Sequence, residues 1–164
     1  MKSLIIYFSR ADENYAVGYI DKGNTEIVAE YIKEFTNADI FKVEPLVAYS
    51  KDYNTCIQEA KQRTNTHNAP IKENVPDISE YDLIYIGVPV YWGGMPEEMF
   101  TALGGLNFNG KIIKPFVTHE GSGLSSIQNQ IKNICIGATI EDGIAIQGCK
   151  VNGSKTQIEN WVSK

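Results

Sequence analysis

Hydroxyl, amide and glycine residues gather around the end of the first apolar run, where they could bind an anion. Ser9 and Arg10 end this run, and after a polar stretch the chain reaches Gly23, Asn24 and Thr25 at the start of a helical pattern. The free N–H groups and the dipole of a helix N-terminus attract phosphate, and the Arg10 guanidinium could add positive charge. The same side chains would also suit an ordinary helix cap beside a surface arginine. This segment therefore predicts a phosphate site or, alternatively, a capped helix.

Two adjacent aromatic residues mark a second segment that could bind a ligand. It comprises Pro89, Val90, Tyr91, Trp92 and Gly93, and a second glycine follows directly. Aromatic rings stack on flat polar heterocycles, while backbone groups bared by glycine can hydrogen-bond to the edge of the heterocycle. The alternative is that Trp92 covers the end of the core, as large aromatic residues commonly do.

A third, polar loop could close the same site from another side. It contains Thr118, His119, Gly121 and Gly123. His119 could donate a proton, although a lone histidine in a loop is more often only a polar surface group.

Other site chemistries find no support in the residue spacing. Residues 105–111 read G-x-x-x-x-G-K, but Ile112 stands where a P-loop has a hydroxyl residue, and the segment precedes a strand pattern. Residues 121–126 read G-x-G-x-x-S, which lacks the third glycine of a dinucleotide fingerprint and follows the fourth strand pattern instead of the first. His67 and His119 lie far apart and outside any metal or hydrolase motif, so no metal is expected.

Five apolar runs alternate with five helical patterns, and these elements must position the three loops. The runs rich in β-branched and aromatic residues are residues 3–8, 39–43, 82–88, 111–117 and a weaker, interrupted run at 138–146. Helical spacing of apolar residues occurs around residues 27–35, 53–60, 96–104, 124–134 and 158–162. The alternation predicts an α/β fold with three layers, α/β/α, around a five-stranded parallel sheet. With the strand order 2-1-3-4-5, the loops after the first and third strands meet where the order reverses, which is where ligands bind.

Length and composition narrow the classes of function. The 164 residues predict one domain spanning residues 1–164. Fifteen Lys and Arg against twenty Asp and Glu give a net charge of −5, which argues against binding to nucleic acid or to an anionic membrane surface. The apolar run near the start is too short for a signal sequence or a membrane span, so we expect a cytoplasmic protein. Cys56, Cys135 and Cys149 form no paired motif and are expected to be reduced thiols.

The three loops, taken together and in this order, resemble the flavodoxin family in its short-chain form. The matching segments are Tyr7-Phe8-Ser9-Arg10 joined to Gly23-Asn24-Thr25, then residues 87–93 and residues 115–123. The resemblance extends along nearly the whole chain. It implies a flavodoxin-like fold with bound FMN.

The resemblance assigns the FMN phosphate to the first loop, where the binding residues would be Ser9, Asn24 and Thr25, with Gly23 making the turn. Residues 11–22 interrupt this loop, which is usually compact in the family. Tyr15 or Tyr19, within this insertion, could fold back over the cofactor as a lid.

The other two loops would hold the isoalloxazine ring. Residues 89–93 would flank the ring, with Tyr91 or Trp92 stacked on it, and residues 118–123 would lie at its far side. The flavin would carry out the redox chemistry and the protein would tune it. From the glycine pair we further hypothesise that the backbone carbonyl of Gly93 or Gly94 accepts a hydrogen bond from flavin N5.

Two redox functions and one other class follow from these features. The protein could be an electron shuttle that docks on a redox partner protein. It could instead be an oxidoreductase whose FMN passes hydride from NAD(P)H to a quinone or a similar small-molecule electron acceptor. The modest net charge and the aromatic residues of the insertion favour the enzyme slightly. A non-redox, receiver-like binding module would need acidic residues at the strand ends, and the first strand ends in Ser9 and Arg10 instead.

Overall fold

The predicted strand positions form one parallel sheet. In the computed structural model, which describes residues 1–164, β1 (Ser3–Phe8) lies between β4 (Asp39–Val43) and β5 (Leu83–Pro89), and β6 (Ile112–His119) follows β5. β7 (Thr139–Ile140) pairs with the start of β6, and β8 (Ile144–Gln147) pairs with its end. The order β4-β1-β5-β6-β7 confirms the α/β, flavodoxin-like fold class with its order 2-1-3-4-5. Two short strands in succession fill the fifth position.

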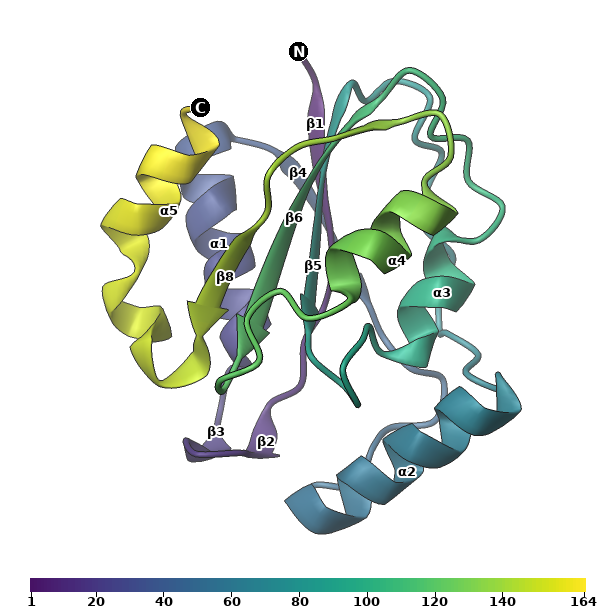
Figure 1. Ribbon diagram of the computed structural model, residues 1–164, viewed down its shortest axis with the longest axis vertical. Helices are drawn as coiled ribbons and strands as arrows, with labels where there is room; N and C mark the ends of the chain where they lie inside the picture. Colours follow the sequence, from purple (N-terminus) through teal and green to yellow (C-terminus); the bar gives the residue numbers. More distant parts are fainter.

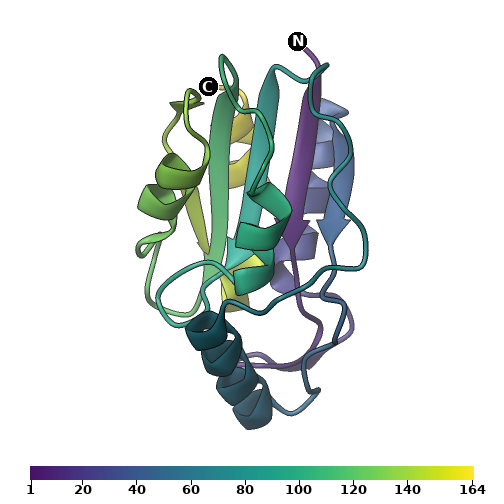
Figure 2. The same cartoon turned by 90° about the vertical axis from the view of Figure 1, so that its right-hand side faces the viewer.

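Helices cover both faces of this sheet and give three layers. α1 (Asn24–Thr36) and α5 (Lys155–Val162) lie on one face, while α3 (Glu97–Leu103) and α4 (Ile127–Ile134) lie on the other (Figure 1). A short 3₁₀ helix, η1 (Gly148–Gly153), precedes α5. α2 (Tyr53–Thr66) differs from the other helices because it lies beyond the carboxyl ends of the strands, as Figures 1 and 2 both show. No helix combines the length and the apolar character that a membrane span requires.

The alternating side chains of the strands build one core on each face of the sheet. In β1, Leu4, Ile6 and Phe8 belong to the cluster that includes α3 and α4, whereas Ile5 and Tyr7 belong to the cluster that includes α1 and α5. Both sets are buried, which explains why the strand shows no polar alternation. The two cores hold the carboxyl ends of β1, β5 and β6 side by side, so the loops that follow them meet.

The insertion at residues 11–22 folds as a small hairpin that the sequence did not predict. β2 (Asp12–Asn14) and β3 (Gly18–Ile20) pair in antiparallel fashion at the same end of the molecule as α2 (Figure 1). Its strands have only three residues each and no apolar alternation, so their pairing depends on contacts with the rest of the chain.

Candidate functional site

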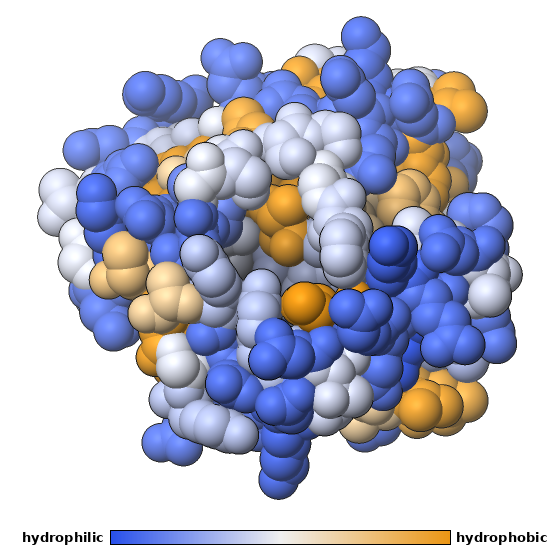
Figure 3. Space-filling view, turned by 60° about the horizontal axis from the view of Figure 1, so that its bottom comes forward, coloured by the Kyte–Doolittle hydropathy of each residue, from blue (hydrophilic) through white to orange (hydrophobic).

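A cavity of about 370 Å³ opens at the carboxyl edge of the sheet. It lies at the reversal of the strand order, between the loops after β1, β5 and β6, with α2 and the hairpin as further walls. Figure 3, which brings this end of the molecule forward, shows a hollow with hydrophobic atoms at its floor. The residues that line the cavity are Ser9, Arg10, Asn14, Tyr15, Asn24, Thr25, Tyr53, Cys56, Ile57, Ala60, Pro89, Val90, Tyr91, Trp92, Thr118, His119, Glu120 and Ser122.

The structure brings nine of the thirteen predicted site residues to this cavity. They are Ser9, Arg10, Asn24, Thr25, Pro89, Val90, Tyr91, Trp92 and Thr118. The remaining four are glycines that shape the loops but do not line the cavity: Gly23, Gly93, Gly121 and Gly123. Which of these residues contact a ligand stays a prediction.

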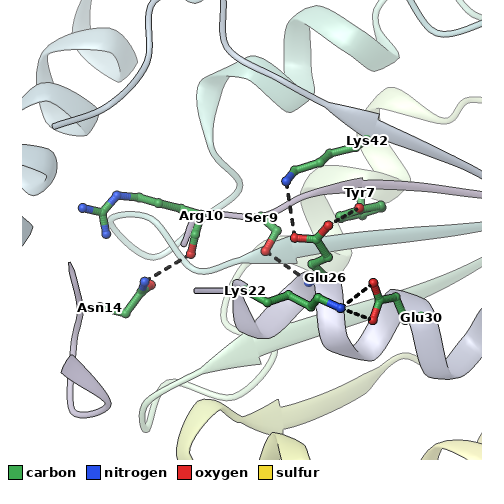
Figure 4. A network of polar contacts seen from close by, with 8 residues as sticks. All are labelled: Tyr7, Ser9, Arg10, Asn14, Lys22, Glu26, Glu30 and Lys42. Atoms are coloured by element: carbon green, nitrogen blue, oxygen red, sulfur yellow. Dashed lines mark hydrogen bonds and ion pairs between the residues drawn. The ribbon is translucent and has the colours of Figure 1, made fainter. Parts of the chain in front are cut away.

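The two halves of the first loop meet in spite of the insertion. The Ser9 hydroxyl accepts a hydrogen bond from the Glu26 amide in the first turn of α1, at 3.1 Å (Figure 4). A Cβ atom placed on Gly23 would lie 2.1 Å from Ser9 Oγ and 2.7 Å from the Arg10 carbonyl oxygen. Only glycine permits such a close return of the chain. The β2–β3 hairpin therefore projects outward from the loop between β1 and α1, and the two ends of that loop still meet as in a compact turn.

The start of α1 is open to an anion. Gly23 precedes the helix and has no side chain to cap it, so the predicted capping by Asn24 or Thr25 does not occur. Thr25 is instead buried, and its hydroxyl lies 2.7 Å from that of Thr118 at the end of β6. The Glu26 amide is bonded to Ser9, but the amides of Asn24 and Thr25 have no acceptor in the chain and remain available next to two buried hydroxyls.

Arg10 lines the cavity, but its guanidinium also joins three segments of the chain. It donates hydrogen bonds to the backbone carbonyls of Glu13 in the hairpin and of Ser50 and Lys51 before α2. Figure 4 shows the side chain extending away from Ser9 and the start of α1. Arg10 therefore holds the hairpin in place, and the predicted contribution of its charge to phosphate binding remains untested.

The aromatic segment after β5 forms a tight two-residue turn. Tyr91 and Gly94 exchange both backbone hydrogen bonds, at 2.7 and 3.1 Å, and the central residues Trp92 and Gly93 have φ angles of 51° and 79°. Positive φ at both central positions is the type I′ geometry, which is unusual for a tryptophan.

The two aromatic side chains of this turn have different environments. Trp92 is 54% exposed, so it does not cover the core, and its Nε1 donates to the Ile57 carbonyl of α2 at 2.8 Å. The Tyr91 ring packs edge-on against Phe8 and Tyr49, with centroids 5.6 and 5.7 Å apart. Burial raises the pKa of the Tyr91 hydroxyl well above its usual value. Trp92 is thus the ring left free to meet a ligand.

The Gly93 carbonyl is already occupied. It accepts hydrogen bonds from the hydroxyls of Ser125 at 2.6 Å and Ser126 at 2.5 Å. These two donors satisfy both lone pairs of the oxygen. A flavin donor would have to displace one of these hydroxyls, and the Gly94 carbonyl already accepts from the Tyr91 amide, so the contact of either carbonyl with flavin N5 stays a prediction.

Sequence reasoning missed one wall of the cavity. Tyr53, Cys56, Ile57 and Ala60 lie on one face of α2. Their spacing was recognisable as a helical stripe, but a stripe of this kind looks the same whether it faces the core or a ligand. Burial raises the pKa of the Cys56 thiol.

The two tyrosines considered as a lid have different positions. Tyr15 lines the cavity, and its ring lies 5.9 Å from that of Tyr53. Tyr19 is outside the lining and largely exposed. Of the two, only Tyr15 is placed to cover a ligand.

Buried polar atoms without a partner also point to this cavity. Three such side-chain atoms occur in the molecule, and all belong to residues that line it: Arg10 Nε, Tyr91 Oη and Glu120 Oε1. Buried polar groups nearly always have a hydrogen-bond partner. Their gathering here is expected where a polar ligand completes the structure.

The chain matches one family model, and its fold matches that of several solved structures. The family model for flavodoxin matches residues 13–164. Two putative flavoproteins of known structure, from Bacteroides eggerthii DSM 20697 and Bacteroides uniformis ATCC 8492, are 23% and 21% identical, with TM-scores of 0.77 and 0.78. Those matches cover 99% of this chain and 96% and 98% of theirs. A flavoprotein from Lactobacillus acidophilus NCFM, solved in complex with FMN, is 20% identical over 93% of this chain and 97% of its own, with a TM-score of 0.66. None of the curated proteins matches this sequence.

Proposed function

Because the chain belongs to the flavodoxin family, we propose that it binds FMN in this cavity and acts as a redox protein. The observation that carries the proposal is the N-terminus of α1, whose first two amides have no acceptor in the chain and which opens into an apolar-walled cavity at the strand-order reversal. The Lactobacillus relative solved with FMN supports the choice of ligand.

The anion end of the cavity suits the FMN phosphate. The first amides of α1, with Ser9 beside them and Thr25 and Thr118 next to them, form a set of neutral donors. Neutral donors at a helix N-terminus bind phosphate without a buried cation. Ser9, Asn24, Thr25 and Thr118 would hold the phosphate and the ribityl chain.

The part of the cavity between the loop after β5 and α2 suits a flat ring. Its walls are Pro89, Val90 and Trp92 on one side and the face of α2 on another. The bound flavin would supply reversible electron transfer. The chain itself would exclude water from the ring and offer polar atoms that lack partners, among them Glu120 Oε1.

A small-molecule oxidoreductase is the second candidate, and the walls of the cavity favour it. The hairpin and α2 both flank the opening, and Tyr15 lines it, which leaves less of the ring exposed to a flat protein surface. The alternative partner is a redox protein that docks at this end. Anaerobic mixing of the FMN-loaded protein with NADPH separates the two, because rapid bleaching of the flavin supports the enzyme and no bleaching supports the shuttle.

The test of FMN binding compares two ligands that differ only in the phosphate. The protein, stripped of any flavin, is titrated with FMN and with riboflavin while flavin fluorescence is recorded. A charge-assisted phosphate contact at a helix N-terminus predicts that FMN binds at least roughly tenfold more tightly than riboflavin. Equal affinities would refute the phosphate site, and no binding of either ligand would refute the proposed function.

A further inference from the structure

Helix α2 forms one wall of the cavity but has little apolar contact with the rest of the molecule. Only Cys56 and Ala60 are buried among its fourteen residues. Figures 1 and 2 show the helix apart from the four helices that flank the sheet. Because two small side chains contribute little burial energy, polar contacts must fix where this wall stands.

The C-terminal half of α2 is fixed by a buried ion pair. Arg63 Nη1 lies 2.7 Å from Glu98 Oε1 in the first turn of α3, and the Glu98 side chain is fully buried, with 0% exposure. The Tyr49 hydroxyl donates to the other carboxylate oxygen of Glu98 at 2.8 Å. The Arg63 guanidinium also lies 3.8 Å from the centre of the Tyr49 ring. Arg63 and the Tyr49 hydroxyl therefore occupy both carboxylate oxygens of Glu98.

This network joins two walls of the cavity. In the sequence, Glu98 comes a few residues after the turn that carries Trp92, whereas Arg63 belongs to α2. On the cavity side the same two segments meet again through the hydrogen bond from Trp92 to the Ile57 carbonyl. Tyr49 extends the network beneath the cavity, because its ring packs against Phe8 and Tyr91.

A buried ion pair restrains position strongly. Moving α2 would take Arg63 away from the fully buried Glu98 carboxylate, and a desolvated charge without a partner is very unfavourable. A sliding or tilting of α2 is thus opposed more by this pair than by apolar contact.

We propose that Glu98 is a positioning residue of the cavity, which through Arg63 and Tyr49 fixes α2 and thereby the width of the ligand site. The inference rests on the proposed function only for the identity of the ligand. The position of the wall can be measured without any cofactor, because Cys56 lies on the inner face of α2 and its thiol is buried.

The decisive variant is Glu98→Gln, and Glu97→Gln is its matched control. Glu97 stands next to Glu98 in the same helical turn, but its partner is His67, which is 79% exposed on its side chain. Glu98→Gln keeps the shape of the side chain and leaves Arg63 without a counter-charge. In the absence of FMN, we expect N-ethylmaleimide to label Cys56 roughly tenfold faster in Glu98→Gln, and within about twofold of wild type in Glu97→Gln.

A second readout uses the ligand. Glu98→Gln should weaken FMN binding by roughly tenfold and shift the flavin midpoint potential, because the α2 wall meets the ring differently, while Glu97→Gln should change neither. Unchanged Cys56 labelling in folded Glu98→Gln would overturn the inference, whatever happens to FMN. Faster labelling of Glu98→Gln, together with a wild-type protein that does not bind FMN, would uphold the inference and refute the proposed function instead.

A double variant covers the case in which Glu98→Gln does not fold. Arg63→Met combined with Glu98→Gln removes both charges, so no buried charge is left alone, and the glutamine can still accept from Tyr49. This protein should fold and should still show faster labelling of Cys56. Labelling at the wild-type rate in the double variant would equally overturn the inference.

Discussion

Replacing Gly23 with alanine should separate the two halves of the anion site while leaving the sheet intact. The new Cβ would lie 2.7 Å from the Arg10 carbonyl oxygen, although Cβ contacts under 3.0 Å essentially do not occur in proteins. The backbone oxygen cannot rotate away, so the chain must shift at the junction of β1 and α1. The backbone of Gly23 itself, with φ −62° and ψ 150°, suits alanine, so any effect is steric.

The expected magnitude has two parts. Overpacking of a tight contact typically costs about 1–3 kcal/mol. The Cβ would also lie 2.1 Å from Ser9 Oγ, and rotation of that hydroxyl would break its bond with the Glu26 amide, which adds about 0.5–1.5 kcal/mol. Together these predict a loss of roughly 1.5–4.5 kcal/mol of unfolding free energy. We also expect FMN to bind roughly 10- to 100-fold more weakly.

The assay pairs denaturant unfolding with flavin fluorescence titration. Gly153→Ala is the matched control, since its Cβ would meet nothing within 4 Å and its φ is not positive. Wild-type FMN affinity in Gly23→Ala would show that the close return of the chain at Gly23 does not build the phosphate site, and the reasoning would then fail.

Three further outcomes are expected. Thr25→Val leaves the buried Thr118 hydroxyl without its partner and should cost about 1–3 kcal/mol in urea unfolding, with weaker FMN binding; an unchanged midpoint would contradict this. At pH 8 a thiol reagent should label Cys149 quickly in the folded protein and should spare Cys56 and Cys135, because burial raises the pKa of both thiols. Denaturation should expose all three cysteines to the reagent. Fast labelling of Cys135 in the folded protein would contradict its burial. Burial raises the pKa of Cys135 to about 12, whereas an unperturbed thiol ionises near 9.0, so the unfolded state alone loses this proton between those values and stability falls as the pH rises. Cys135→Ala should reduce that fall by up to about 1.4 kcal/mol per pH unit in unfolding measured between pH 8 and 11, and parallel curves would exclude the thiol as a cause.

The sheet was predictable because its strands are continuous apolar runs buried on both faces. β1 and β4 begin and end at the predicted residues. The β2–β3 hairpin was not predictable, because its three-residue strands carry no hydrophobic pattern of their own. Its position depends on Arg10, whose bonds to Ser50 and Lys51 connect segments forty residues apart.

The site was predictable to the extent that topology determines it. The three loops converge because parallel strands end at one edge, so Ser9, Trp92 and Thr118 line one cavity. The α2 wall could not be foreseen, because the direction in which a helix face points is decided by tertiary contacts. Nothing in the spacing relates Glu98 to Arg63, thirty-five residues earlier, yet this pair helps to place that wall.

The left-handed backbone of Trp92 creates a conflict at one position between thermal stability and ligand binding. A residue with a Cβ at positive φ carries strain on the order of 1–2 kcal/mol, which asparagine or glycine would largely relieve. Directed evolution under heat selection alone would therefore favour such replacements at position 92. Each would remove the indole from the cavity wall, together with its bond to α2. A thermostability library of this protein should accordingly be screened for bound flavin in the same round, so that variants that gain melting temperature by losing the Trp92 indole, and with it ligand binding, are rejected.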